Sequence, residues 1–327
     1  MAKKSYAPPY RITEKIMHLT AEISEQVGAI TMKAGAVASP KLRRENQIRS
    51  IHSSLAIENN SLSLVQVTDI INGKRVLGPP SEIREVKNAY EAYNLLLTFD
   101  PYSMDDLLAA HKILMADLSK EAGRFRSGGV GVFAGKQLVH MAPPAKIVPE
   151  LMNNLMHWVI SSEAHQLIKS CVFHYEFEFI HPFDDGNGRM GRMWQTLLLT
   201  RWKPLFAWLP VEDQIRKRQQ EYYDAIELCN KAADSTDFVE FMLTAIRDAL
   251  SELLQTEQVT VQVERLLAAL GSETLSAREL LERLGLKHRP TFLTTYLHPA
   301  LELGLIEMTI PEKPNSNKQK YRAVKHV

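Results

Sequence analysis

The chain has 327 residues, of which 45% are hydrophobic and 24% are charged, and its formal net charge is +1 at pH 7. These proportions are typical of a soluble globular protein, and the length allows two domains. A net charge so close to zero excludes general binding to polyanions, so any contact with nucleic acid would have to come from a local patch. The sequence has no run of about 18 apolar residues, and we expect no membrane partner.

The cysteines and the N-terminal segment indicate the compartment. Cys171 and Cys229 lie in helical patterns without the spacing of metal ligands, so we expect two reduced thiols in a core. Residues 1–11 lack the apolar stretch of a secretory signal. The sequence therefore predicts a cytoplasmic protein.

Helical patterns predominate from residue 1 to about residue 250. Ser63 and Gln66 form a capping box at the start of one apolar helical pattern, and Gly73 follows its end. Pro80 begins a second pattern, and Ser103 begins a third. The fold class that these patterns predict is mainly α.

Residues 123–140 interrupt the helices. They contain two short runs of β-prone residues around Ala134 and Gly135, which predicts a β-hairpin. Pro143 and Pro144 follow and prevent an immediate return to helix.

A helical pattern over residues 167–180 leads directly into His181-Pro-Phe-Asp-Asp-Gly-Asn-Gly-Arg-Met-Gly-Arg192. His181 offers a base that works near neutral pH. Asp185 offers a hard oxygen ligand of the kind that Mg²⁺ prefers, whereas Asp184 reads as a solvated turn residue. His174 and His181 have no third ligand for zinc in view, so we expect His174 to support packing.

The second half of the same run predicts an anion site. Gly186, Asn187 and Gly188 can bend the chain so that backbone N–H groups converge at the N-terminus of the helix that follows. Arg189 and Arg192 are three residues apart, which puts both guanidinium groups on one side of that helix.

The twelve residues resemble the signature of the Fic (Fic/Doc) family at every defined position. The resemblance implies a Fic-type helical bundle with a β-hairpin flap. It also implies an enzyme that transfers AMP from ATP to a Ser, Thr or Tyr hydroxyl of a target protein, including itself. In that reaction His181 is the general base and Asp185 holds Mg²⁺. The amides of residues 186–188, with Arg189 and Arg192, hold the phosphates.

The resemblance gives the predicted hairpin a role as well. In the Fic family a hairpin before the signature clamps an extended target segment by strand addition. The residues that we expect to form this target-docking flap are Val130, Val132, Leu138 and His140. The alternative interpretation is a surface hairpin with no role.

Residues 54–59 resemble the inhibitory motif of the same family. Ser54 and Glu58 are four residues apart on a helix with an apolar face, and Glu58 lies near its C-terminus. A carboxylate there is poorly placed for the helix dipole, so it should gain from a cationic partner. The resemblance implies that the partner is Arg192, which Glu58 would withhold from the γ-phosphate.

A boundary is expected between residues 254 and 260. Beyond it, the sequence predicts a helix over 261–270, a helix capped by Ser276, a third helix from Arg289, and strands over 305–310 and 319–324. This order resembles a winged helix. The expected domains are an N-terminal helical region (1–100, with an inhibitory helix at about 45–59), a Fic core (101–254, with packing that continues to about 250) and a winged helix (255–327).

The winged-helix region carries basic residues, which leaves a second function open. They are Lys287, His288, Arg289, Lys313, Lys318, Lys320 and Arg322. Such residues could contact DNA, but winged helices also bind proteins, and basic wings are often only solvated.

The leading hypothesis is an autoinhibited protein adenylyltransferase. A second is that the same site removes AMP, with Glu58 orienting water. A third is a transcriptional regulator that senses a nucleotide. Because Fic proteins of this layout often dimerise, a homodimer is a further expectation. The sequence leaves the protein target and the trigger open.

Overall fold

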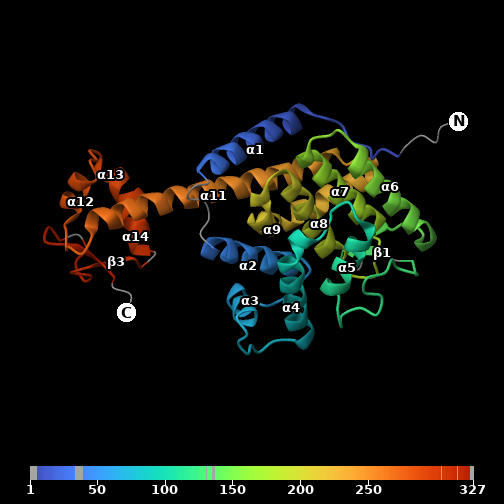
Figure 1. The fold of residues 1–327 in the computed structure, drawn as a ribbon, viewed down its shortest axis with the longest axis horizontal. Coiled ribbons are helices and arrows are strands. Elements are labelled where there is room, and N and C mark those ends of the chain that lie inside the picture. Colours follow the sequence, from blue (N-terminus) through green and yellow to red (C-terminus); the bar gives the residue numbers. More distant parts are fainter. Residues whose placement is uncertain are drawn as a thin grey trace. The chain divides into compact units, whose positions relative to one another are not determined.

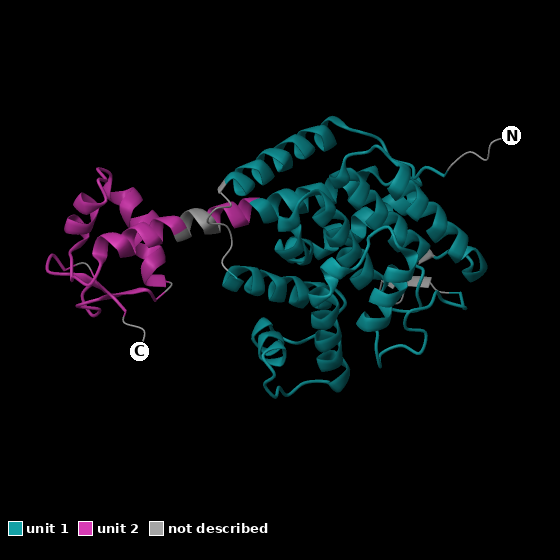
Figure 2. Ribbon diagram, in the orientation of Figure 1, with its two compact units in different colours: residues 1–250 teal, residues 251–327 magenta. Residues whose placement is uncertain are grey.

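The structure, a computed structural model, describes residues 6–33, 40–129, 131–134, 137–302, 304–314 and 316–324. For residues 33, 131–134, 137–141 and 256–260 it describes the backbone alone. The chain divides into two compact units, residues 1–250 and residues 251–327 (Figure 1, Figure 2). The mainly α-helical fold that the sequence predicted is confirmed.

The first unit contains the N-terminal helices and the helices around the signature. Its α-helices are α1 (Glu14–Lys33), α2 (Pro40–Ile57), α3 (Leu64–Ile71), α4 (Pro80–Asn94), α5 (Met104–Leu114), α6 (Val148–Ser161), α7 (Gln166–Ile180), α8 (Asn187–Trp202), α9 (Val211–Lys217), α10 (Gln219–Ala232) and the first part of α11 (Thr236–Leu270). The expected helix starts are confirmed. Ser63 forms the full capping box of α3, and Ser103 caps α5.

The core of this unit is built around α7 and α8, the helices on either side of the His181 loop. Positions 167–177 of α7 and 189–200 of α8 are all buried. Helices that are buried on every side are typical of the centre of a large core. Both cysteines are buried and free, in agreement with the expected reduced thiols. The loop between α7 and α8 is therefore anchored in the core at both ends.

The predicted hairpin is present. Strands β1 (Gly131–Ala134) and β2 (Gln137–Met141) pair in antiparallel fashion, with an irregularity in register between Val132 and Phe133. Of the expected flap residues, Val130 lies outside the described residues. Val132, Leu138 and His140 lie in the strands, and only their backbone is described.

The second unit has the element order expected of a winged helix. It contains α12 (Ala277–Arg283), then α13 (Arg289–Phe292), a π-helical turn (Leu293–Leu297) and α14 (His298–Glu302), followed by strands β3 (Ile306–Met308) and β4 (Tyr321–Ala323). Strand β4 pairs with β3, and Tyr321 also bridges Leu275. The capping box of Ser276 on α12 is present.

One element differs from the prediction. The helix expected over residues 261–270 is the end of α11, which runs without a break from Thr236 to Leu270. The segment between residues 254 and 260 contains neither Gly nor Pro. Its polar and β-branched residues suggested a boundary, but each costs a helix only about 0.7 kcal/mol or less. The same segment therefore continues the helix.

Among the described residues, no helix is long and apolar enough to cross a lipid bilayer.

The core of the second unit should depend on Phe292, which is fully buried there. We expect Phe292→Ala to destabilise this unit by about 3–5 kcal/mol, because the truncation leaves a cavity. Hydrogen exchange followed by mass spectrometry should show faster exchange in residues 275–302 and unchanged exchange in α7 and α8. Thr294→Ala, on an exposed position of the same segment, is the control. Equal acceleration in both units would contradict this prediction.

Candidate active site

His181 lies where α7 ends and the signature loop begins. Its backbone is left-handed (φ 50°), which is uncommon for a residue other than glycine. Its N–H donates to the Phe177 carbonyl at 2.9 Å and closes the last turn of α7. The following residues Pro182 and Phe183 turn back into the core, and Phe183 is fully buried. The imidazole is thus carried by a fixed bend of the chain.

Asn187 closes the loop with its side chain. Its Oδ1 accepts from the Phe183 N–H at 2.9 Å, and its Nδ2 donates to the Phe183 carbonyl at 2.9 Å. Gly186, which precedes α8, has a φ of 83° that favours glycine. The first intrahelical bond of α8 is donated by Met190 to Gly186 at 2.9 Å. The amides of residues 187–189 therefore have no partner within the helix, as expected for an anion site.

His111 supports the loop from α5, and the sequence did not single it out. The Gly123 N–H donates to its Nδ1 at 2.9 Å, so Nε2 carries the proton and donates to the Asp185 carbonyl at 3.0 Å. The ring stacks on Phe183 at 3.6 Å between centroids. Burial lowers the pKa of His111 below its usual value, which keeps the ring neutral. His111 thus fixes the position of the Asp185 backbone.

Arg126 is a second residue that sequence analysis missed. It is buried, and its guanidinium donates to carbonyls of the loop and of the chain around the hairpin. The acceptors include His181 at 2.7 Å, Gly128 at 2.9 Å and Pro143 at 2.5 Å. Arg126 is one of two arginines in the glycine-rich segment 123–129, and nothing in the sequence placed these carbonyls together. Arg126 ties both ends of the hairpin segment to the residue that carries the imidazole.

Asp185 is placed so that a metal ion could reach it. Its side chain is 61% exposed, while its Oδ1 accepts from Arg189 Nη2 at 2.9 Å and from the Gly186 N–H at 2.5 Å. The described residues contain no cluster of three or more His, Cys, Asp or Glu that could hold a metal alone. One carboxylate with phosphate oxygens and water is a common way to hold Mg²⁺, and Asp185 fits that arrangement.

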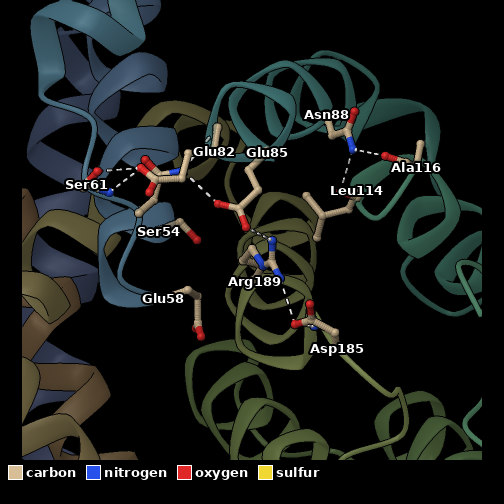
Figure 3. A network of polar contacts seen from close by, with 12 residues as sticks. Ser54, Glu58, Ser61, Glu82, Glu85, Asn88, Leu114, Ala116, Asp185 and Arg189 are labelled. Atoms are coloured by element: carbon tan, nitrogen blue, oxygen red, sulfur yellow. Dashed lines mark hydrogen bonds and ion pairs between the residues drawn. The ribbon is translucent and has the colours of Figure 1, made fainter. Parts of the chain in front are cut away.

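Arg189 lies between two carboxylates, as Figure 3 shows. Besides Asp185, its Nη1 contacts Glu85 Oε1 of α4 at 3.3 Å. The other oxygen of Glu85 accepts from Asn60 Nδ2 at 2.8 Å. Arg189 Nε is buried and has no hydrogen-bond partner within the described part of the chain. The N–H at Arg189 Nε is therefore suited to donate to an additional acceptor, such as an oxygen of a bound ligand.

Arg192 makes the contact with Glu58 that the sequence predicted. Its Nη2 donates to Glu58 Oε1 at 2.8 Å and to the Ser54 carbonyl at 2.9 Å, and its Nε donates to Ser54 Oγ at 3.1 Å. The Arg192 side chain is 1% exposed and that of Glu58 is 34% exposed. A Cβ placed on Gly188 would lie 2.2 Å from Glu58 Oε1, so the carboxylate lies against the loop amides.

The end of α2 fixes the backbone of Glu58. Asn59 is left-handed (φ 68°), and the N–H groups of Asn59 and Asn60 donate to Ala56 and Leu55, each at 3.1 Å. This pair of bonds is a Schellman motif with asparagine in the usual glycine position. Asn59 therefore caps the C-terminus of α2 and ends the helix directly after Glu58.

Two buried titratable groups pack behind Arg192. His174 contacts Gln195 at 2.6 Å and Tyr222 at 3.1 Å, and burial lowers its pKa to about 3, in agreement with the expected packing role. Glu178 has an 11% exposed side chain and lies 3.8 Å from His174 Nε2. Burial raises the pKa of the Glu178 carboxyl to about 8, although Arg192 opposes this shift.

The raised pKa of Glu178 predicts a dependence of stability on pH. An unfolded Glu titrates at about 4.3. The folded state therefore binds more protons than the unfolded state between this value and about 8, and the free energy of unfolding falls as the pH rises through that window. Glu178→Gln should remove this fall in the free energy of unfolding. Between pH 5.5 and pH 8.5, the free energy of unfolding of the variant should rise relative to that of the wild type by roughly 1–3 kcal/mol.

Urea denaturation at the two pH values measures this difference. Glu150→Gln, on an exposed position of α6, is the matched control. A Glu178→Gln protein that loses stability with pH as the wild type does would contradict the prediction.

Comparisons with known proteins identify the family. Residues 101–199 match the model described as Fic/DOC family, and residues 261–323 match the Fic-like C-terminal domain of filamentation induced by cAMP protein. A crystal structure of a Fic family protein from Desulfovibrio desulfuricans has a TM-score of 0.76 and 55% identity, with 98% of this chain and 99% of that chain covered. The Fic-1 structure of C. elegans has a TM-score of 0.61 at 20% identity, covers 76% of this chain and 73% of that chain, and shows the fold alone.

Two curated relatives are named protein adenylyltransferase Fic. The one from Aedes aegypti is 29% identical over 217 residues, which are 63% of this chain and 41% of the relative. The one from Nematostella vectensis is 26% identical over 255 residues, which are 73% of this chain and 57% of the relative. The chain thus spans about half the length of the curated relatives that it matches. On the strength of its full-length similarity to the Desulfovibrio protein and of the two matching domain models, this chain belongs to the Fic family.

Proposed function

We propose that this protein is an autoinhibited protein adenylyltransferase. It transfers AMP from ATP to a Ser, Thr or Tyr hydroxyl of a target protein, including itself, and releases pyrophosphate. The observation that carries the proposal is the contact of Glu58 with Arg192 beside the loop amides. The curated relatives named adenylyltransferase support the reaction class.

His181 is the general base of the proposed reaction. It takes the proton of the target hydroxyl as the hydroxyl oxygen attacks the α-phosphorus, and the bond from that phosphorus to the pyrophosphate oxygen breaks. Its left-handed bend and the Arg126 contact to its carbonyl hold it in position. Transfer depends on this placement because the reacting atoms must be aligned.

The start of α8 is the proposed phosphate site. The amides of Asn187 and Gly188, with that of Gly186 once it leaves Asp185 Oδ1, hold the α-phosphate, and Arg189 and Arg192 neutralise the remaining charge. Mg²⁺, held by Asp185 and phosphate oxygens, would supply further neutralisation of the triphosphate. Arg189 Nε and Arg192 Nη1, both buried donors without a hydrogen-bond partner among the described residues, support this assignment.

Glu58 is the proposed inhibitor, together with Ser54. Their contacts occupy Nε and Nη2 of Arg192, and the carboxylate lies against Gly188. ATP that binds while Glu58 is in place loses one arginine at its γ-phosphate. The α-phosphate is then no longer held in line with the attacking hydroxyl of the target.

Other parts of the proposal rest on the family resemblance. The hairpin β1–β2 is the proposed docking flap, to which an extended target segment adds as a strand. The homodimer and the cytoplasmic location stay predictions from the sequence.

Removal of AMP by the same site is the second candidate. In that reaction Glu58 would orient water for attack on the modified residue. The 34% exposure of the Glu58 side chain leaves it accessible to water. The behaviour of the Glu58→Gly protein described below separates the two candidates.

A DNA-binding regulator is the third candidate, and charge segregation in the second unit favours it over a plain solvated surface. Residues 287–301 contain no acidic residue, and Lys287 and Arg289 are exposed at the start of α13. Incubation with α-labelled ATP and Mg²⁺ and a DNA shift assay distinguish the functions. Label on protein supports transfer, whereas a specific DNA shift without label supports the regulator.

We expect His181→Ala to abolish AMP transfer while ATP binding and the fold persist, because only the proton acceptor is lost. Labelling with α-labelled ATP and binding of ATP by calorimetry measure the two properties on the same sample. A transfer rate equal to that of the wild type would contradict the assignment of His181 as the general base.

Glu58→Gly should raise transfer and autolabelling by about 100-fold, since misplacement of reacting groups by about 1 Å has a cost of that order. Arg192→Ala should not be activated, because it frees Glu58 but removes the phosphate ligand. The double variant should behave like Arg192→Ala alone, as expected of coupled residues. Labelling of the wild type and the three variants is the measurement. Equal activity of wild type and Glu58→Gly would contradict the proposed autoinhibition. Loss of activity in Glu58→Gly would support the second candidate, removal of AMP by the same site.

A further inference from the structure

The residues that follow Glu58 tie the end of α2 to α4. Asn60 is buried, and its Nδ2 donates to Glu85 Oε2 at 2.8 Å and to the Glu82 carbonyl at 3.3 Å. Its Oδ1 accepts from the Leu62 N–H at 3.1 Å. Every polar atom of this side chain is therefore used, and two of the three contacts reach α4.

Ser61 adds a second connection to the same helix. Its N–H and its Oγ both donate to Glu82 Oε2 at 2.7 Å. Figure 3 shows Ser61 beside Glu82, with Glu85 one turn further along α4. The Ser61 contacts are exposed to solvent, so they contribute less than the buried Asn60 contacts.

Glu85 continues the connection to the signature. Its second oxygen contacts Arg189 Nη1 at 3.3 Å, and Arg189 contacts Asp185 at 2.9 Å (Figure 3). The short segment after α2 therefore meets α8 in two places. Glu58 contacts Arg192 directly, and Asn60 contacts Arg189 through Glu85.

We propose that Asn60 and Glu85 are positioning residues for Glu58, which hold the end of α2 against α4 and so keep the carboxylate on Arg192. This inference rests on the proposed autoinhibition. Arg192 is buried and needs a partner, but the Glu58 carboxylate is one-third exposed, so water competes for it and its side chain loses freedom when it pairs. A carboxylate at a helix C-terminus is disfavoured further by the dipole. If Asn60 and Glu85 fix the turn after α2, less conformational entropy is lost when Glu58 pairs with Arg192.

The proposal requires that Asn60 acts only through Glu58, whereas Glu85 also contacts Arg189 directly and is therefore left unchanged in the test. Within the described part of the chain, the hydrogen bonds of the Asn60 side chain go to Glu82, Glu85 and Leu62, and none of them reaches His181, Asp185, Arg189 or Arg192. A purely structural residue would lower activity whether Glu58 is present or absent. A positioning residue for the inhibitor should raise activity when Glu58 is present and have no effect when it is absent.

Asn60→Asp is the sharpest variant, because it keeps the shape and the acceptor for Leu62 but turns a carboxylate toward Glu85. In the wild-type background we expect AMP transfer, measured with α-labelled ATP, to rise on the order of tenfold, the effect of one hydrogen bond to a charged group. In the Glu58→Gly background we expect no change. This non-additivity is the expected mark of coupled residues.

Asn94→Asp is the matched control. Asn94 is exposed at the end of α4, the helix that carries Glu82 and Glu85. Its Oδ1 accepts from Gln47 at 3.3 Å, and an aspartate would keep this bond. The control should leave transfer unchanged. Asn60→Ala, which removes the contacts without adding charge, serves if the charged variant does not fold, and thermal unfolding identifies that case.

The outcomes separate the inference from the function on which it rests. If Glu58→Gly raises transfer but neither Asn60 variant does, the positioning role is overturned and the autoinhibition stands. A fall in transfer in both backgrounds would overturn the role in the same way. If Glu58→Gly itself fails to raise transfer, the proposed autoinhibition and this inference both fall.

Discussion

Arg192 is the residue on which the site depends, because a guanidinium with 1% of its side chain exposed must be paired to be tolerated in a core. The pairing comes from Ser54 and Glu58, which lie 138 and 134 residues earlier in the chain. Removing the carboxylate of such a pair leaves a buried charge, so the contact also stabilises the docking of α2 on α8. Stability of the fold and the proposed restraint of the reaction thus depend on the same two groups.

The charges around the loop already pair the arginines that are proposed to hold phosphate. Three carboxylates, Glu58, Glu85 and Asp185, contact the guanidinium groups of Arg189 and Arg192. A polyphosphate must compete with them for the same donors. Glu178 adds no charge near neutral pH, since its pKa of about 8 keeps it largely protonated. A divalent cation at Asp185 would change this balance more than any single side chain.

Local signals predicted much of this arrangement, and long-range contacts escaped prediction. The capping boxes, the hairpin and the order of site residues follow from patterns within a few positions, and they are present. His111, Arg126 and Glu85 could not be found in this way, because their partners lie 74, 55 and 104 residues away. The contact of Asn60 with α4 could not be predicted either, because it depends on how α2 packs. The continuity of α11 was missed because weak helix formers were read as a break.

The clearance at Gly188 has a consequence for how this protein can change by mutation. No side chain larger than hydrogen fits beside the Glu58 carboxylate, since an added methyl carbon would lie 2.2 Å from it. A substitution at this position would therefore expel the inhibitor and, at the same time, crowd the amides where phosphate is proposed to bind. A substitution of Gly188 that releases Glu58 would therefore also impair the proposed binding of phosphate. If Glu58 is the inhibitor as proposed, variants that are constitutively active should arise by changes on α2 and its following turn.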